Sequence, residues 1–234
     1  MNIYDQTPFF EAYSQMGRSR EGLDGAGEWY QMQPLFPQLE GKQVLDLGCG
    51  YGWHCGYAAS QGAARVVGID QSRQMIQTAR QKNNHPVVEY QVCSLEDYAY
   101  PAETFDLVVS NLALHYVADL TGIYSRIHRT LKPGGVFLMN IEHPVFTAGV
   151  NQQFSPDGTW PVDHYYEPGA RMVDFLGFAV TKYHHTLTQI LGGLLETGFC
   201  LQTIEEVQPP PAWREAMPEE MRRPMMLLVR GQKV

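Results

Sequence analysis

The chain has 234 residues, of which 44% are hydrophobic and 18% are charged, and its formal net charge is −8. This length fits one domain over residues 1–234 with a sizeable core. An acidic chain without a basic run is a poor match for nucleic acid. No apolar stretch approaches the ~18 residues of a membrane span.

The N-terminus and the cysteines give an expectation for the compartment. Residues 1–5 lack the basic and apolar segments of a secretory signal, so we expect a cytoplasmic protein. The four cysteines are Cys49, Cys55, Cys93 and Cys200. They form no C-x-x-C pair, and we expect reduced thiols and no metal site.

Residues 1–40 are rich in aromatic side chains. Phe9, Phe10, Tyr13 and Met16 have a spacing that predicts a helix. Such a helix could pack on a sheet, or it could act as a lid over a bound ligand. We expect a mixture of both, in which Tyr13 faces the ligand.

The run Gln43–Leu47 predicts a strand that is buried on both faces, because its apolar residues are consecutive rather than alternating. Gly48, Gly50 and Gly52 follow, and the bulky Trp53 begins the next predicted helix, which ends at Gly62. The spacing differs from the G-x-G-x-x-G of dinucleotide sites, where small residues meet a pyrophosphate. It favours a nucleoside with a small charged tail.

A second strand, Arg65–Ile69, ends at Asp70, and Ser72 is placed to cap the helix that follows. A carboxylate at the end of this strand can accept hydrogen bonds from the two hydroxyls of a ribose. The alternative is an acid that interacts with the helix dipole. The third strand is predicted over Val87–Cys93.

The fourth strand, Phe105–Asn111, is followed by a helix over Leu120–Leu131. Lys132-Pro133-Gly134-Gly135 predicts the end of that helix, and Val136–Ile141 is the fifth strand. In an open parallel sheet, ligands bind beyond the carboxyl ends of the strands.

Four polar residues are expected at that edge: Asn111, His115, Glu142 and His143. Each has a structural alternative. His115 could be a hydrogen-bonded histidine at a helix start, and Pro144 could fix a turn after Glu142 and His143.

Residues 143–183 form an insertion that is too long for a simple connection. It is either a surface hairpin or a segment that shapes a substrate site. A helix over Thr186–Thr197 and strands over Cys200–Val207 and Met225–Arg230 complete the predicted chain.

Three motifs in this order resemble those of class I S-adenosylmethionine (SAM) dependent methyltransferases, and in particular the small-molecule enzymes of the methyltransferase type 11 group. They are Val44–Gly52, Phe105-Asp106 and Leu131–Gly135. The resemblance implies an α/β, Rossmann-like fold in three α/β/α layers. Its sheet would have seven mostly parallel strands, with the last strand antiparallel.

The resemblance implies SAM as the cofactor, with S-adenosylhomocysteine (SAH) as its product. Asp46 would fix the turn or receive the cofactor's amino group, and Ser94 stands where family members commonly carry an acid for the adenine. The cofactor contacts that we expect are Tyr13, Asp46, Leu47, Gly48, Cys49, Gly50, Gly52, Asp70, Gln71, Met75, Ser94, Leu95, Asn111 and Leu112.

The expected reaction is a direct displacement that moves the methyl group to oxygen, nitrogen or carbon of a small-molecule acceptor. His143, Glu142 and His115 are the candidates for a general base. An NAD-dependent oxidoreductase and a non-catalytic SAM-binding protein are the alternatives. The sequence identifies neither the acceptor nor the oligomeric state.

Overall fold

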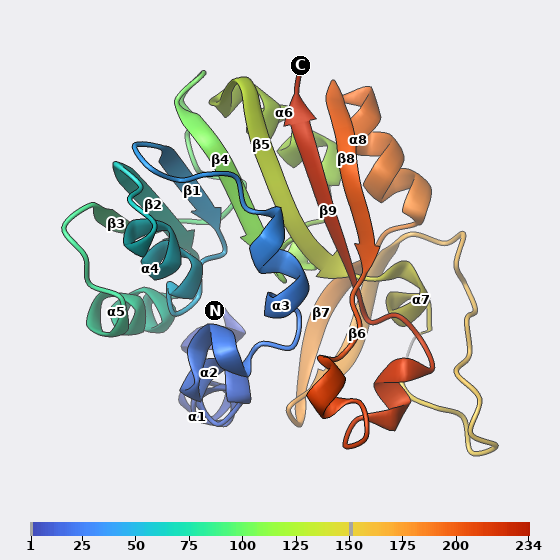
Figure 1. Cartoon of the computed structure of the whole chain (residues 1–234). Coiled ribbons are helices and arrows are strands. Elements are labelled where there is room, and N and C mark those ends of the chain that lie inside the picture. Colours follow the sequence, from blue (N-terminus) through green and yellow to red (C-terminus); the bar gives the residue numbers. More distant parts are fainter. Residues whose placement is uncertain (1, 150–151) are drawn as a thin grey trace.

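The computed structural model describes residues 2–149 and 152–234. Its main feature is a seven-stranded sheet in the order β3-β2-β1-β4-β5-β9-β8 (Figure 1). The strands are β1 (Gln43–Leu47), β2 (Arg65–Asp70), β3 (Val88–Val92), β4 (Phe105–Asn111), β5 (Leu131–Glu142), β8 (Phe199–Glu206) and β9 (Met226–Lys233). β1 to β5 pair in parallel, and β9 lies antiparallel between β5 and β8. The predicted fold class is therefore confirmed.

Helices cover both faces of the sheet. Figure 1 shows α3 and α4 in front of it and α6 behind it. Met32, Ala58 and Ile76 belong to one apolar cluster, whereas Ile127 and Leu194 belong to another. The helices that contribute are α3 (Trp29–Met32), α4 (Trp53–Ser60), α5 (Arg73–Lys82), α6 (Leu120–Thr130) and α8 (Gly193–Glu196).

The predicted boundaries differ most from the structure at two elements. The helix expected over residues 186–197 is a π-helix, Thr188–Gly192, followed by α8. β5 begins at Leu131 rather than Val136, because Leu131 already pairs with Phe105 before a shift in register. The Pro-Gly-Gly segment therefore lies within an irregular part of the strand and does not precede it.

The Phe105-Asp106 motif ties the start of β1 to β5. Asp106 Oδ2 accepts hydrogen bonds from the Gln43 N–H and from Lys132 Nζ, each at 2.8 Å. Two of the recognised motifs thus meet in one contact, at the end of the sheet opposite the carboxyl edge of β1 and β4.

The N-terminal segment lies at the carboxyl edge of the parallel strands, with α1 and α2 below α3 in Figure 1. It consists of a 3-10 turn (Ile3–Asp5), α1 (Thr7–Ser14), α2 (Gly17–Arg20) and a second 3-10 turn (Gly22–Gly25) before α3, with a third (Gln33–Leu35) after it. Asp5 fixes this segment to α5, because its Oδ1 accepts hydrogen bonds from Ser72 Oγ (2.7 Å) and from the Gln74 N–H (3.1 Å). Phe9 is fully buried. The predicted N-terminal helix is present as α1.

The insertion contains α7 (Pro144–Thr147) and an antiparallel hairpin of β6 (Gly169–Phe175) and β7 (Phe178–His184). The hairpin extends from the same edge of the sheet as α1 (Figure 1). Residues 150–151 of the predicted insertion, and residue 1, lie outside the described residues. Short 3-10 turns at Leu114–Tyr116, Pro211–Trp213 and Pro218–Met221 complete the elements. Across the residues that the structure describes, no helix has the length and apolar character needed to cross a bilayer.

Candidate functional site

A cavity of about 330 Å³ lies at the carboxyl edge of the sheet. The N-terminal segment, the loops after β1 to β4, the end of β5 and β7 all contribute to its walls. Its lining includes these residues from the sequence prediction: Tyr13, Gly48, Cys49, Gly50, Asp70, Gln71, Met75, Ser94, Leu95, Asn111, Leu112, His115 and Glu142. Segments that are far apart in the chain therefore meet around one space, as expected for the carboxyl edge of a parallel sheet.

The glycine loop after β1 is held in a conformation that suits glycine. Gly48 and Gly50 have φ values of 74° and 52°, in the left-handed region. The N–H groups of Gly48 and Cys49 both donate to the Ile69 carbonyl at 2.9 Å. No atom lies within 4 Å of the position that a Cβ of Gly50 would take, so the backbone is open to a ligand there.

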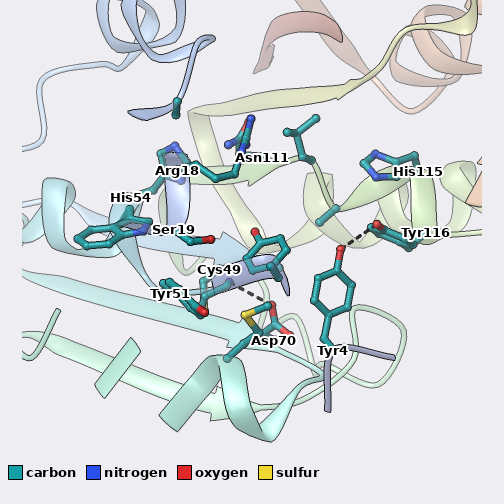
Figure 2. Close-up of a pocket in the computed structure, with 18 of the residues that line it drawn as sticks. Tyr4, Arg18, Ser19, Cys49, Tyr51, His54, Asp70, Asn111, His115 and Tyr116 are labelled. Carbon is teal, nitrogen blue, oxygen red and sulfur yellow. Dashed lines mark hydrogen bonds between the residues drawn. The ribbon is translucent and has the colours of Figure 1, made fainter. Parts of the chain in front are cut away.

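Asp70 lies beside this loop at the end of β2 (Figure 2). Its Oδ2 accepts the Gly50 N–H at 3.0 Å, and its Oδ1 accepts the Ser72 N–H at 2.8 Å. Burial raises the pKa of Asp70 to about 6. Each carboxylate oxygen keeps a free lone pair, so the group can still accept two further hydrogen bonds.

Three of the predicted cofactor residues do not line the cavity. Leu47 is fully buried in the core, and Gly52 caps α4 at φ 76° with the Tyr90 hydroxyl where a Cβ would lie. Asp46 is 1% exposed, and its Oδ2 accepts a hydrogen bond from Cys55 Sγ at 3.3 Å. Burial raises the pKa of Asp46 to about 7. The side chains of Asp46 and Leu47 and the backbone of Gly52 therefore lie outside the cavity lining.

His143 also lies outside the cavity lining, contrary to the expectation of a base at this edge. Its Nδ1 accepts the Val145 N–H at 3.1 Å, which caps α7, and its Nε2 lies 3.2 Å from Glu206 Oε1. Both ring nitrogens are thus engaged, one by the first turn of α7 and the other by Glu206 of β8. The alternation of side chains along an extended backbone explains the result, because consecutive residues at the end of β5 point in opposite directions.

Glu142 and His115 do meet in the cavity. His115 Nε2 lies 3.9 Å from Glu142 Oε1, and Lys182 of β7 donates a hydrogen bond to the same carboxylate oxygen. Burial lowers the pKa of His115 to about 4, so its imidazole is neutral at neutral pH. Burial alone would raise the pKa of Glu142, but His115 and the Lys182 ammonium outweigh it and hold this pKa below its usual range. The result is an ionised carboxylate beside a neutral imidazole.

A second buried ion pair lies at the other side of the cavity. Arg18 of α2 donates to both oxygens of Glu28, at 2.9 and 3.1 Å. Asn111 Nδ2 donates to Glu28 Oε1 at 2.9 Å, and Asn140 Nδ2 donates to Asn111 Oδ1 at 2.8 Å. This network connects the N-terminal segment with the ends of β4 and β5 and presents Arg18 to the cavity.

Aromatic side chains form the remaining wall. The hydroxyls of Tyr4 and Tyr116 lie 2.8 Å apart across it (Figure 2), and Tyr13 packs edge-on against Tyr4. Phe175 of the hairpin lines the same space. Sequence reasoning did not assign Tyr4, Tyr116 or Phe175 to the site. An aromatic-rich N-terminus was the available signal for Tyr4, and its position next to His115 was the signal for Tyr116.

Ser94 lines the cavity, but its hydroxyl is engaged elsewhere. Ser94 Oγ donates to Asp97 Oδ2 at 2.8 Å and accepts the Asp97 N–H at 3.1 Å. Its side chain is therefore turned toward its own loop. Contacts to an adenine at this position would come from the backbone or from Leu95.

The lining suits a ligand that is polar at several points. Within residues 2–149 and 152–234, three residues of the lining have a buried polar atom without a hydrogen-bond partner: Ser19 Oγ, Trp53 Nε1 and His115 Nδ1. Such groups are costly when they stay unpaired. Together with the open glycine backbone and the Asp70 carboxylate, they fit a nucleoside with a charged amino-acid tail, as SAM is. The same part of the chain holds no group of three His, Cys, Asp or Glu side chains placed for a metal ion.

Comparison with known proteins gives a consistent result. Residues 45–139 match the family model of a methyltransferase domain. The chain is 31% identical to N-demethylindolmycin N-methyltransferase of Streptomyces griseus, over 80% of this chain and 79% of the relative. It is 33% identical to a ubiquinone biosynthesis O-methyltransferase of Neisseria meningitidis, over 71% of this chain and 82% of that protein.

A solved structure extends the likeness to the fold. The crystal structure of an S-adenosylmethionine dependent methyltransferase from Mesorhizobium loti superposes with a TM-score of 0.84 at 38% identity, covering 91% of this chain and 100% of that chain. These proteins are methyltransferases, and the alternative of an NAD-dependent oxidoreductase finds no support. The chain therefore belongs to the class I SAM-dependent methyltransferases.

Proposed function

We propose that this enzyme methylates a small, uncharged acceptor that carries a hydroxyl or an N–H group. The observation that carries the proposal is that Glu142 and His115 share one cavity with the glycine loop and Asp70. A cofactor pocket and a polar pair able to take a proton are thus parts of the same space. When bound, SAM supplies an electrophilic methyl carbon next to an excellent leaving group.

Residues of the loops would hold the cofactor. The glycine loop at Gly48 to Gly50 would admit the amino-acid tail, because the backbone is open at Gly50, and Asp70 would accept the ribose hydroxyls. Met75 and Leu95 would enclose the adenine. Arg18 also lines the cavity, but its guanidinium already binds both oxygens of Glu28.

The protein would act mainly by alignment. Fixing acceptor and methyl donor in one geometry can lower a barrier by ~7–11 kcal/mol. Residues 1–40 would serve as the helical lid, because α1 and Tyr4 close one wall of the cavity. Residues 143–183 would set acceptor specificity through Phe175 and Lys182, as parts of a single methyltransferase domain over residues 1–234.

The acceptor's proton would pass to the Glu142–His115 pair. A neutral imidazole can accept a proton, and the ionised carboxylate 3.9 Å away stabilises the imidazolium that forms. The His143 ring is directed away from the cavity, which leaves His115 and Glu142 as the candidates for a base.

The charges of the cavity favour an uncharged acceptor. Among the residues that the structure describes, the two cationic side chains of the lining, Arg18 and Lys182, are each paired with a buried carboxylate. A phosphate or carboxylate at the reacting end would therefore find no free cation. The named relatives include an N- and an O-methyltransferase, so both kinds of acceptor atom are compatible with this scaffold.

A panel of acceptors on one aromatic scaffold tests the proposal. The panel would carry a phenol, an aniline, an N-methylaniline, a carboxylate or a phosphate monoester, and SAH release would be measured. We expect turnover of one of the first three and none of the anions. Preferential turnover of an anionic member would contradict the proposed acceptor class.

Variants of the pair test its role on the acceptor that is found. We expect kcat to fall on the order of 100-fold in H115A and in E142Q, as is typical for loss of general acid–base catalysis. H143A serves as the matched control, because it removes a buried histidine of the same strand end that does not line the cavity. Full turnover in both H115A and E142Q would refute the assignment.

A further inference from the structure

Lys182 is a buried lysine on β7, a strand whose side chains alternate between buried and more exposed positions. Along β7, Val180, Lys182 and His184 are buried while Ala179 and Thr181 are exposed. Lys182 is 4% exposed, although lysine is among the residues that are rarely buried unless they are paired. A methionine would fill the same position in an apolar hairpin, so packing alone does not account for the ammonium.

The contacts of Lys182 lead to the reacting end of the cavity. Its Nζ donates to Glu142 Oε1 and lies 4.8 Å from the centroid of the Phe175 ring. Glu142 in turn is 3.9 Å from His115 Nε2. One cation of the insertion thus touches the carboxylate and an aromatic residue of the cavity wall.

The free-energy cost of burying the Lys182–Glu142 ion pair indicates that Lys182 has a functional role. Removing two charges from water costs several kcal/mol per ion, and a buried pair commonly stabilises a fold no more than apolar residues of the same size. Together with His115 and Gln152, Lys182 keeps the pKa of the Glu142 carboxyl low in a place where burial would favour the protonated form.

We propose that Lys182 is a positioning residue for methyl transfer, which holds the Glu142 carboxylate ionised and directed toward His115. This inference rests on the proposed function, because it places the methyl end of the cofactor beside this pair. The hairpin β6–β7 is then part of the reaction site. Without Lys182, the carboxylate would take up a proton and could no longer support the imidazole.

Several polar or titratable groups face Glu142 and would influence its titration. They are His115 and Tyr116 of the turn after β4, Lys182 of β7, and the amide of Gln152, whose Nε2 lies 3.4 Å from Glu142 Oε2. Asp70, which lines the same cavity, and Asp46, which lies outside the lining, also have pKa values that burial raises. Variants that differ only at Lys182 and Glu142 share these other groups.

The ratio of the dissociation constants of SAM and SAH reports the net charge of the Glu142–Lys182 pair, and its measurement needs no acceptor. The two ligands differ by one methyl group and one positive charge, so their ratio senses the charge of the nearby pair. Calorimetric titrations from pH 6.5 to 9 would compare wild type, K182M, K182R and the double variant K182M/E142Q. A change of one unit of charge in this pair should alter the ratio on the order of tenfold at an effective permittivity of about 20.

We expect the ratio of the SAM and SAH dissociation constants to depend most strongly on pH in K182M. In K182M, the pKa of Glu142 should rise, so the preference for SAM should increase with pH, by about tenfold between the protonated and the ionised carboxyl. K182R should behave like wild type. K182M/E142Q should lose the additional pH dependence of the ratio that K182M shows. K132M is the matched control, because Lys132 pairs with Asp106 at the other end of the sheet.

The outcomes separate the inference from the proposed function. If neither SAM nor SAH binds the wild type, the proposed function fails. If both bind but K182M and K182M/E142Q show the same pH dependence, Lys182 does not control the charge of Glu142 and the inference is wrong. E142Q gives a second test should K182M not fold, because the unpaired ammonium should then disfavour SAM about tenfold at every pH; an unchanged ratio would equally overturn the inference.

Discussion

Protonation of Asp70 should weaken the binding of SAH below pH 6. In its ionised form, Asp70 accepts the N–H groups of Gly50 and Ser72 and retains a lone pair on each oxygen for the ribose. A protonated carboxyl has one oxygen that is mainly a donor. The backbone donors and the ribose hydroxyls would then compete for fewer acceptors.

The pKa of Asp70 determines how much the Kd of SAH should change with pH. Burial raises the pKa of Asp70 to about 6, so about one carboxyl in ten is ionised at pH 5. The Kd of SAH should therefore rise about tenfold between pH 7 and pH 5, which corresponds to ~1.4 kcal/mol. Each hydrogen bond to a charged group contributes ~1.5–3 kcal/mol, so D70N should weaken binding by at least about tenfold at pH 7 and should remove the slope.

Calorimetric titration of SAH at pH 5, 6, 7 and 8 measures its Kd in the wild type and in D70N. D46N is the matched control, because Asp46 is a buried carboxyl of the adjacent strand with a pKa of about 7 that does not line the cavity. The histidines of the lining, His54 and His115, have pKa values lowered by burial to about 4 and stay neutral in this range. A flat Kd in the wild type, or an equal slope in D70N, would refute the reasoning.

Two further predictions concern stability and use urea unfolding. R18M leaves Glu28, which is 1% exposed, without its guanidinium, and should cost about 3 kcal/mol, whereas R18M/E28Q should recover most of the loss; no recovery would show that the pair is not the cause. G52A places a Cβ against the Tyr90 hydroxyl at φ 76° and should cost about 2 kcal/mol or more, whereas G41A, at φ 71° in open space, should cost about 1 kcal/mol. Equal losses in the two alanine variants would contradict this contact as the source of the difference.

The sheet was predictable because its signals are local. Consecutive apolar residues in Gln43–Leu47 and Phe105–Asn111 mark strands buried on both faces, and both strands have the predicted bounds. Glycines at positive φ mark the loop after β1. The π-helix at Thr188–Gly192 was not predictable, because its apolar pattern is also that of an ordinary helix.

The part of the candidate site that lies at the ends of strands was predictable from the sequence. Asp70 and Glu142 each follow a recognisable strand, and both line the cavity. Lys182 and Arg18 were missed because their partners lie 40 and 10 residues away, in other elements. His143 was misplaced because a residue at a strand end can face either side, and sequence position alone does not distinguish the two.

A crystal structure with bound SAH is the sharpest test of the proposed site, because it locates the sulfur from which a methyl group leaves. We expect the ribose on Asp70, the amino-acid tail at the glycine loop, and the sulfur facing the space beside Glu142 and His115. A homocysteine carboxylate bound at Lys182, or a sulfur directed away from that space, would contradict it.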